Sequence, residues 1–442
     1  MKKVALHNLG CKVNAYETEA MQQMLEREGY EIFPFQEGAD IYIINTCTVT
    51  NIADRKSRQM LHRARKMNPD AIVVAAGCYV QAQEDENHPA DPCIDIIIGN
   101  NKKKDLISVL KAYEIRKAQK EVIDIGHTTE YEELKLTKTG EHTRAYIKVQ
   151  DGCNQFCSYC IIPFARGRVR SRKPEDVVSE VSRLAENGYQ EVVLTGIHLS
   201  SYGIDLRNEA EENETEPDGS GHPDLLSLIL KVHEVEGIQR IRLGSLEPRI
   251  ITERFVRTIA SLPKICPHFH LSLQSGCDET LLRMNRRYTS VEYYEKCELL
   301  RKYFDNPALT TDIIVGFPGE TEEEFAASKA FVDKVNFYET HIFKYSKREG
   351  TKAAVMENQI PETVKTKRSA ELIELGRIKQ AEYEKSFLGK EVEVLVEERT
   401  REQGRSVLIG HTKEYLKVRL DTEEKLENQI VSIVLDERHL TT

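Results

Sequence analysis

Short apolar runs rich in β-branched residues alternate with amphipathic stretches along most of the chain. In the first hundred residues, strands are expected at Lys3–Leu9, Asp40–Asn45 and Ala71–Ala76, with helical patterns at about residues 16–29 and 52–67. Strands that alternate with helices pair in parallel, because each helix returns the chain to the same edge of the sheet. This pattern predicts a small α/β domain at the amino terminus.

The same alternation continues between residues 145 and 344. Strands are expected at Ala145–Val149, Glu191–Thr195, Gln239–Leu243, Phe269–Leu273, Thr311–Val315 and Thr340–Lys344. Six strand and helix units in series predict a partial (β/α)6 barrel, whose site lies at the carboxyl ends of its strands.

A polar spacer near residue 374 separates this region from short alternating strands. They are expected at Glu391–Val396, Arg405–Gly410, Leu416–Leu420 and Ile430–Leu435, which predicts a small all-β domain. The expected organisation is an α/β domain over residues 1–115, a linker over 116–138, the barrel over 139–372 and the β domain over 374–442. The acidic stretch 208–224 has the composition of an inserted loop, and no function is assigned to it.

Composition places the chain among globular proteins and narrows its partners. Of 442 residues, 40% are hydrophobic and 30% charged, and no apolar run approaches the roughly 20 residues of a membrane helix. The start of the chain lacks a secretory pattern, so we expect a cytoplasmic protein that does not associate with membranes. The formal charge of -10 argues against indiscriminate binding to nucleic acid but leaves local basic patches available for it.

Three cysteines lie within eight residues just after the first predicted barrel strand. Cys153, Cys157 and Cys160 form the pattern C-x-x-x-C-x-x-C. Three thiolates suit a 4Fe–4S cluster whose fourth iron stays open for a small molecule. Zinc is the alternative, but no fourth ligand follows within the usual distance of about 12 to 20 residues.

Three other cysteines are far apart in the sequence but equivalent in the predicted fold. Cys11, Cys47 and Cys78 each follow a strand of the amino-terminal domain by one to three residues. Carboxyl ends of parallel strands lie along one edge, so we expect these cysteines to form a second centre, of zinc or iron–sulfur. Cys93 precedes its strand, Ile94–Ile98, and should lie at the opposite edge. Cys266 and Cys297 are expected in the core, and Cys277 is left unassigned.

Polar and basic residues flank the predicted site. Those at the ends of barrel strands should converge on one mouth: Thr195, Gly196, Ser245, Glu247 and Gln274. Two basic groups are candidates for RNA phosphate contacts: Arg55 and Arg58 in the helix after Cys47, and the run Arg166, Arg168 and Arg170 after the cysteine loop. For the helix, an ordinary solvated face is the alternative.

The cysteine loop resembles that of radical SAM enzymes, in which an aromatic residue such as Tyr159 precedes the last cysteine. The whole chain resembles the methylthiotransferase family, with His270–Gly276 and Met284–Tyr288 close to the family's forms. Leu9–Asn14 resembles the signature of the MtaB branch, which modifies N6-threonylcarbamoyladenosine beside the anticodon of tRNA. The sister branches act on isopentenyladenosine of tRNA and on an aspartate of a ribosomal protein.

The resemblance implies cofactors, partners and a reaction. It implies two 4Fe–4S clusters, on Cys153, Cys157 and Cys160 and on Cys11, Cys47 and Cys78. It implies S-adenosylmethionine (SAM) on the open iron, with its adenine beside Tyr159 and its amino group near Thr195 and Gly196, while Ser245, Glu247 and Gln274 are further candidates to bind it. It also implies a carboxyl-terminal TRAM domain, an OB-like barrel that binds RNA, and an electron-donor protein as a partner.

The implied reaction begins when the first cluster cleaves SAM to a radical that abstracts the hydrogen from C2 of adenine. The second cluster carries or donates the sulfur, which is methylated by a second SAM. The same chemistry on isopentenyladenosine or on a ribosomal-protein aspartate is an alternative, as is a metal-stabilised RNA-binding protein without catalysis.

Overall fold

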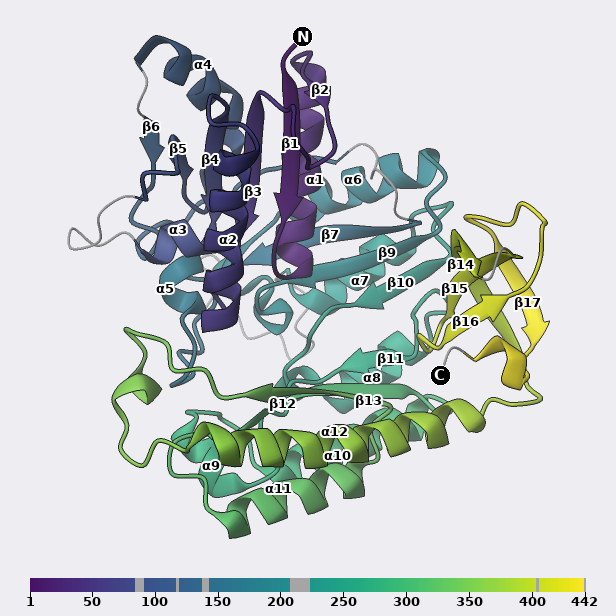
Figure 1. The fold of residues 1–442 in the computed structure, drawn as a ribbon. Helices are drawn as coiled ribbons and strands as arrows, with labels where there is room; N and C mark the ends of the chain where they lie inside the picture. Colours follow the sequence, from purple (N-terminus) through teal and green to yellow (C-terminus); the bar gives the residue numbers. More distant parts are fainter. Residues whose placement is uncertain (84–90, 117–118, 137–142, 207–222, 403–404, 441–442) are drawn as a thin grey trace.

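The computed structural model describes residues 1–83, 91–116, 119–136, 143–206, 223–402 and 405–440 (Figure 1). The amino-terminal domain is a six-stranded parallel sheet in the order β2-β1-β3-β4-β5-β6. Its elements are β1 (Lys3–Asn8), α1 (Lys12–Arg27), β2 (Glu31–Ile32), β3 (Ile41–Thr46), α2 (Asn51–Met67), β4 (Ile72–Gly77), α3 (Cys78–Ala82), β5 (Ile96–Ile98), α4 (Leu106–Arg116) and β6 (Gln119–Glu121). The expected α/β class is confirmed.

Two strands of this sheet were not predicted. They are β2 and β6, which have two and three residues and pair at the two edges. Runs this short give no readable alternation of polar and apolar positions. Since β6 pairs with β5, the segment expected to be a linker contributes a strand to the first domain.

The barrel region is an open arrangement of parallel strands, with one short antiparallel strand, β8, at an edge and helices on its outside. Its elements are β7 (Arg144–Asp151), α5 (Ile162–Arg166), β8 (Arg170–Ser171), α6 (Pro174–Glu186), β9 (Glu191–Gly196), α7 (Leu225–His233), β10 (Arg240–Leu243), α8 (Glu253–Ala260), β11 (His268–His270), α9 (Asp278–Arg283), α10 (Ser290–Tyr303), β12 (Ala308–Val315), α11 (Glu322–Val335), β13 (Glu339–Lys344) and α12 (Glu362–Lys385). The six predicted strands are present as β7, β9, β10, β11, β12 and β13.

These strands form two sheets, β10-β9-β7-β8 and β11-β12-β13. Isolated parallel bridges, Ile241 to Ile265 and Leu246 to Leu271, join them between β10 and β11. Strand β11 is shorter than expected: beyond it the amide of Leu273 donates to the side-chain hydroxyl of Thr311 instead of a backbone carbonyl oxygen, and Gln274 has φ of 71°. Of the acidic stretch, residues 208–222 lie outside the described residues, and Asp224 is the N-cap of α7.

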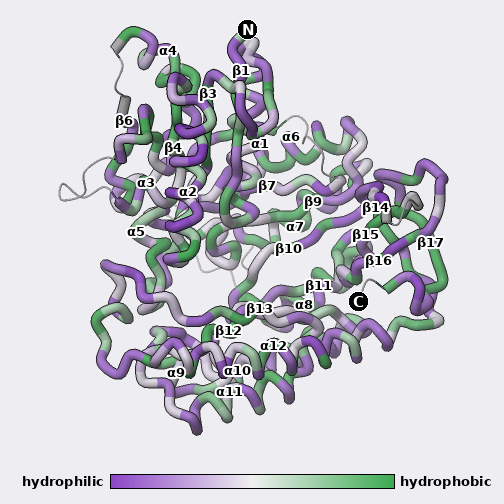
Figure 2. The backbone as a smooth tube through the Cα atoms, viewed as in Figure 1, coloured by the Kyte–Doolittle hydropathy of each residue, from purple (hydrophilic) through white to green (hydrophobic). Residues whose placement is uncertain are grey.

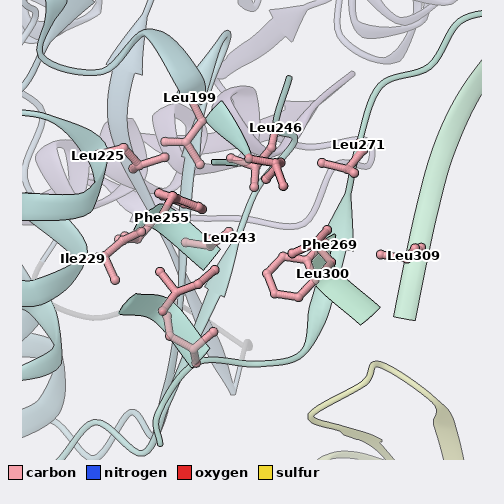
Figure 3. Packing of buried hydrophobic residues seen from close by; sticks show 14 of the residues in the cluster. Leu199, Leu225, Ile229, Leu243, Leu246, Phe255, Phe269, Leu271, Leu300 and Leu309 are labelled. Carbon is pink, nitrogen blue, oxygen red and sulfur yellow. The ribbon is translucent and has the colours of Figure 1, made fainter. Parts of the chain in front are cut away.

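One large hydrophobic core joins the strands to their helices. In Figure 3, Leu225 and Ile229 of α7 point toward Leu243 on β10, and Phe269 on β11 lies beside Leu300 of α10. Figure 2 shows hydrophobic residues along the inner strands and mixed hydropathy along the covering helices. The buried surface of apolar side chains supplies the main driving force for this packing.

The carboxyl-terminal domain is an antiparallel sheet in the order β16-β15-β14-β17, at the side of the barrel in Figure 1. Its strands, β14 (Glu391–Glu402), β15 (Arg405–Thr412), β16 (Lys417–Leu420) and β17 (Ile430–Val434), match the expected ones. Helix α12 leads into it and runs without a break through residue 373, where the sequence pattern placed the boundary. In the described part of the chain, no helix is long and apolar enough to cross a membrane.

Two buried arginines of β10 dock this domain on the barrel. Arg240 donates to the carbonyl oxygens of His411 and Glu393, at 3.0 and 2.9 Å, and Arg242 donates to that of Lys413 at 2.9 Å. The ring of Tyr415 stacks between those of His268 and His411, with centroid separations of 4.9 and 4.5 Å. The carboxyl-terminal domain is therefore held against the barrel largely through its backbone carbonyl oxygens, together with side-chain contacts of Tyr415, Glu397 and Asn428.

Candidate active site between two cysteine centres

The loop that carries Cys153, Cys157 and Cys160, here called the loop centre, begins at the end of β7. Gly152 has φ of 71°, and a Cβ there would lie 1.8 Å from the carbonyl oxygen of Arg168, so no other residue fits. The segment after α9 holds the loop from the other side. Asn285 donates to the carbonyl oxygen of Phe156 at 2.9 Å, and the amide of Ser158 donates to that of Met284 at 3.0 Å.

The thiols of the loop centre lie in a protein environment with few charges. Burial raises the pKa of Cys153 to about 11 and that of Cys160 to about 12, so without a metal these thiols stay protonated at neutral pH. A cation faces Cys157, whose Sγ accepts a hydrogen bond of 3.3 Å from Arg286. Arg286 has no carboxylate partner in the described part of the chain, and it also donates to the carbonyl oxygen of Ser272.

The second set of cysteines, here called the strand-end centre, is built from three separate loops. Cys11 is the N-cap of α1, Cys47 follows β3, and Cys78 is the first residue of α3 directly after β4. Gly10 has φ of 104°, and a Cβ there would lie 2.9 Å from the Sγ of Cys47. Burial, with the charges of Cys78 and Cys11, raises the pKa of Cys47 to about 11. The expected convergence of these cysteines is present.

A buried charge network supports the strand-end centre. Arg166 donates to the Sγ of Cys78 at 3.2 Å, to Oε1 of Glu17 at 2.6 Å and to Oδ2 of Asp151 at 3.2 Å. Lys148 pairs with both carboxylates, at 2.9 and 2.7 Å, and Lys103 pairs with Glu17 at 3.1 Å. All of these side chains are buried, and they join α1 of the first domain to β7 and α5 of the barrel.

This network corrects two sequence predictions. Arg166 and Arg170 were expected to contact RNA phosphates, but both side chains are fully buried and pair with Asp151. Arg168 remains exposed, with its guanidinium 4.7 Å from the ring centroid of Phe156. Arg55 and Arg58 are exposed on α2 as expected. Their contact with RNA stays a prediction, as does that of Arg168.

Both centres open into one cavity of about 560 Å³. Cys11 lines it together with all three cysteines of the loop centre. The expected cofactor-binding residues also line it, namely Tyr159, Thr195, Gly196, Ser245, Glu247 and Gln274. The structure thus brings the expected residues of the barrel mouth into one space, while their individual roles stay predictions.

Four further ionisable residues of the cavity lining were not singled out from the sequence: Lys12, His198, Arg286 and Asp312. Two of them had a readable signal, because Lys12 follows Cys11 and Arg286 lies within the Met284–Tyr288 segment. His198 had none, since a single histidine after a strand is ordinary. Burial lowers its pKa to about 4, and its Nδ1 lies 2.6 Å from the hydroxyl of Ser201, so the ring is neutral at pH 7.

Gly196 is constrained by its neighbour on β7. A Cβ there would lie 2.8 Å from Oε1 of Gln150, which accepts a hydrogen bond of 2.7 Å from the amide of His198. The same Gln150 donates to the carbonyl oxygen of Gly152, next to the loop centre. One buried side chain therefore fixes two walls of the cavity relative to each other.

The remaining cysteines lie outside the cavity lining. Cys266 and Cys297 are buried in the core, as expected. Cys277 is also buried and donates to Glu279 at 3.0 Å. Cys93 lies before β5, with its Sγ 3.4 Å from Nδ1 of His62, away from the strand-end centre.

The residues of both centres fit iron–sulfur clusters. Each centre offers three thiols and leaves room on the cavity side, and each has one arginine within hydrogen-bond distance of a cysteine sulfur. A positive donor to sulfur compensates the negative charge that three thiolates bring to a cluster. The absence of a side chain at Gly10 leaves the space beside Cys47 free.

Two family models match the chain. The Radical SAM superfamily matches residues 147–332, and the uncharacterised protein family UPF0004 matches residues 3–99. A solved radical S-adenosylmethionine methyltransferase, TsrM from Kitasatospora setae with cobalamin and a [4Fe-4S] cluster, shares the fold. Its TM-score is 0.52 at 17% identity, covering 80% of this chain and 77% of that one. Fold and site together define a radical SAM enzyme with a second cysteine-bearing domain.

Closer relatives specify the family. A threonylcarbamoyladenosine tRNA methylthiotransferase MtaB of Bacillus subtilis is 40% identical over 98% of this chain and 93% of its own, and one of Aquifex aeolicus is 39% identical over 90% and 94%. A tRNA-2-methylthio-N(6)-dimethylallyladenosine synthase of Dictyoglomus thermophilum is 35% identical over 100% and 97%. The chain belongs to the methylthiotransferase family of radical SAM enzymes, whose cofactors are SAM and 4Fe–4S clusters.

Proposed function

We propose that this enzyme attaches a methylthio group to C2 of N6-threonylcarbamoyladenosine, next to the anticodon in tRNA. The observation that carries the proposal is the single cavity lined by Cys11 and by all three cysteines of the loop centre. A reaction that removes a hydrogen at one centre and adds sulfur from another needs both beside the same carbon. Two of the relatives are named for this substrate.

The protein's own residues bind, orient and shield. Cys153, Cys157 and Cys160 would hold the cluster that binds SAM, and the cysteines of the strand-end centre would hold the second. The clusters and SAM, when bound, would supply the radical chemistry that an unactivated C–H bond requires. Arg286 and Arg166 stabilise negative charge on the cysteine sulfurs of the two centres.

RNA recognition would combine a single-stranded loop with backbone contacts. An anticodon-loop base can leave its neighbours and enter a cavity, while exposed cations bind the phosphates. Arg55, Arg58 and Arg168 are the exposed cations that we assign to this task. The carboxyl-terminal domain, which we infer to be a TRAM domain over residues 374–442, would bind RNA farther from the reacting base. The electron would come from a donor protein in the cytoplasm, where tRNA is modified.

The direct test uses anaerobically reconstituted protein with SAM, a chemical reductant and tRNA that carries threonylcarbamoyladenosine. We expect the 2-methylthio nucleoside in digests of the tRNA by mass spectrometry, and its absence with Cys157→Ala. A parallel reaction contains tRNA that carries isopentenyladenosine, because relatives with both names are similar to this chain. A product on that tRNA alone would refute the proposed substrate, and intact SAM despite full iron loading would refute the proposed reaction.

A further inference from the structure

Lys12 is a cation at the wall of the cavity. It is the first residue of α1, directly after Cys11, and lines the same space as the loop centre. In Figure 1, β1 runs toward the barrel sheets and α1 begins there, so the start of the helix faces the barrel. The free N–H groups of a first helical turn add positive potential at this position. The first turn of α1 contains no acidic residue.

The other cations around this space already have partners. Arg242 pairs with Glu191 at 2.8 Å, and Arg144 pairs with Glu397 at 3.1 Å. Arg286 donates to Cys157 and to Ser272. The ammonium group of Lys12 has no hydrogen bond or ion pair with any residue that the structure describes.

The unpaired ammonium group lies among other positive charges. Lys12 is exposed at the cavity wall, where Arg242 and Arg144 repel its charge and Glu191 and Glu339 attract it. No single contact within the fold requires a lysine here, since the ammonium group forms no hydrogen bond with a carboxylate or carbonyl oxygen of the described chain. An anionic ligand group in the cavity would supply the partner that these residues do not.

We propose that Lys12 binds the carboxylate on the amino-acid substituent of N6-threonylcarbamoyladenosine and so sets the specificity of the enzyme. This inference rests on the proposed function. In adenine, C2 and C6 flank the same ring nitrogen, so a base whose C2 lies at the reacting position has its N6 substituent in the same cavity. Of the described residues that line the cavity, Lys12 is the cation without a hydrogen-bond or ion-pair partner, and a hydrocarbon substituent would leave it unpaired.

The test compares two anticodon stem-loops that differ in one group. One carries threonylcarbamoyladenosine, and the other carries the same nucleoside with its carboxylate converted to a carboxamide. For the wild-type enzyme we expect kcat/KM to be on the order of 10- to 100-fold higher for the carboxylate, the range of a hydrogen bond to a charged group. Lys12→Gln should abolish this preference, mainly by lowering kcat/KM for the carboxylate substrate.

Two controls separate recognition from damage to the neighbouring cysteine. Lys12→Arg keeps the charge and should keep the preference, and Lys367→Gln removes an exposed lysine of α12 and should change nothing. The iron content of each variant shows whether the strand-end centre still assembles. The inference would be overturned if Lys12→Gln lowered kcat/KM equally on both stem-loops, or if the wild-type enzyme did not prefer the carboxylate stem-loop. Either result would leave the proposed function intact. A wild-type enzyme inactive on both stem-loops would overturn both.

Discussion

The two cysteine centres offer the same set of ligands but are constructed in different ways. The loop centre takes its thiols from one eight-residue segment, which glycine geometry and backbone hydrogen bonds hold in place. The strand-end centre takes its thiols from three loops, and a buried network that includes Glu17, Asp151 and Arg166 supports it. One centre is therefore a local structure, and the other depends on how two domains fit together.

This difference implies different weaknesses. A local loop can lose one hydrogen bond and keep its shape, because the chain itself keeps the cysteines close. A centre assembled from distant segments has no such safeguard, and the charges beneath it are buried. Breaking one buried ion pair removes a short contact at a place where water cannot replace it.

The largest expected effect separates the chemistry of the centres. Cys157→Ala should abolish SAM cleavage and product formation, because the loop centre would hold the cluster that binds SAM. Cys78→Ala should abolish the methylthio product but retain SAM cleavage, and each variant should lose about half of the iron of the wild-type enzyme. The measurements are iron analysis and mass spectrometry of methionine and of digested tRNA. SAM cleavage that survives in Cys157→Ala would reverse the assignment.

Removing the arginine beside each centre should destabilise the protein more at the strand-end centre than at the loop centre. Arg166→Met breaks a buried ion pair and should lower the free energy of unfolding of the first domain by about 3–5 kcal/mol. Arg286→Met removes hydrogen bonds but no ion pair. It should lower the free energy of unfolding of the barrel by about 1–3 kcal/mol. Urea unfolding of the cluster-free proteins measures both. Equal effects would contradict the distinction between the centres.

Acid should weaken the support of the strand-end centre selectively. The cations Arg166, Lys103 and Lys148 hold the pKa of the buried Glu17 well below its ordinary value of 4.5. The contribution of Glu17 to stability is therefore complete above pH 4.5 and is lost as the pH falls toward its folded-state pKa. The unfolding midpoint of the first domain should fall with the pH in this range, and Glu17→Gln should reduce that dependence. A dependence that Glu17→Gln leaves unchanged would assign the acid sensitivity to other groups.

The smallest effect concerns one hydrogen bond beneath the loop centre. Asn285 has φ of 59°, so Asn285→Gly keeps the left-handed backbone and removes the bifurcated hydrogen bond of the side chain to the carbonyl oxygens of Phe156 and Gln155. The loss of about 1 kcal/mol should make the loop centre release iron to a chelator about fivefold faster. The release from the strand-end centre should not change. Faster release from both centres would show that they are coupled.

Much of the fold and both cysteine sets could be predicted from local patterns. Apolar runs of strand length predicted the inner strands. The position of each cysteine relative to a strand predicted the sheet edge at which that cysteine lies. The buried arginines could not be predicted in this way. Arg166 lies in a basic run that is typical of a surface, and its burial depends on Glu17, which lies 149 residues away in the sequence. His198 became visible only when the cavity was assembled.

The contact between the barrel and the carboxyl-terminal domain places unequal demands on its two sides. Arg240 and Arg242 donate to carbonyl oxygens of residues 393 and 411–413, and every amino acid provides such an oxygen. The two arginines consequently place no demand on the side chains of these residues, although His411 still packs against Tyr415 and Thr412 is buried. The arginines themselves are not replaceable, since no other side chain offers the same fork of donors. Sequence drift in the carboxyl-terminal domain can thus retune its outer surface without moving it relative to the active site.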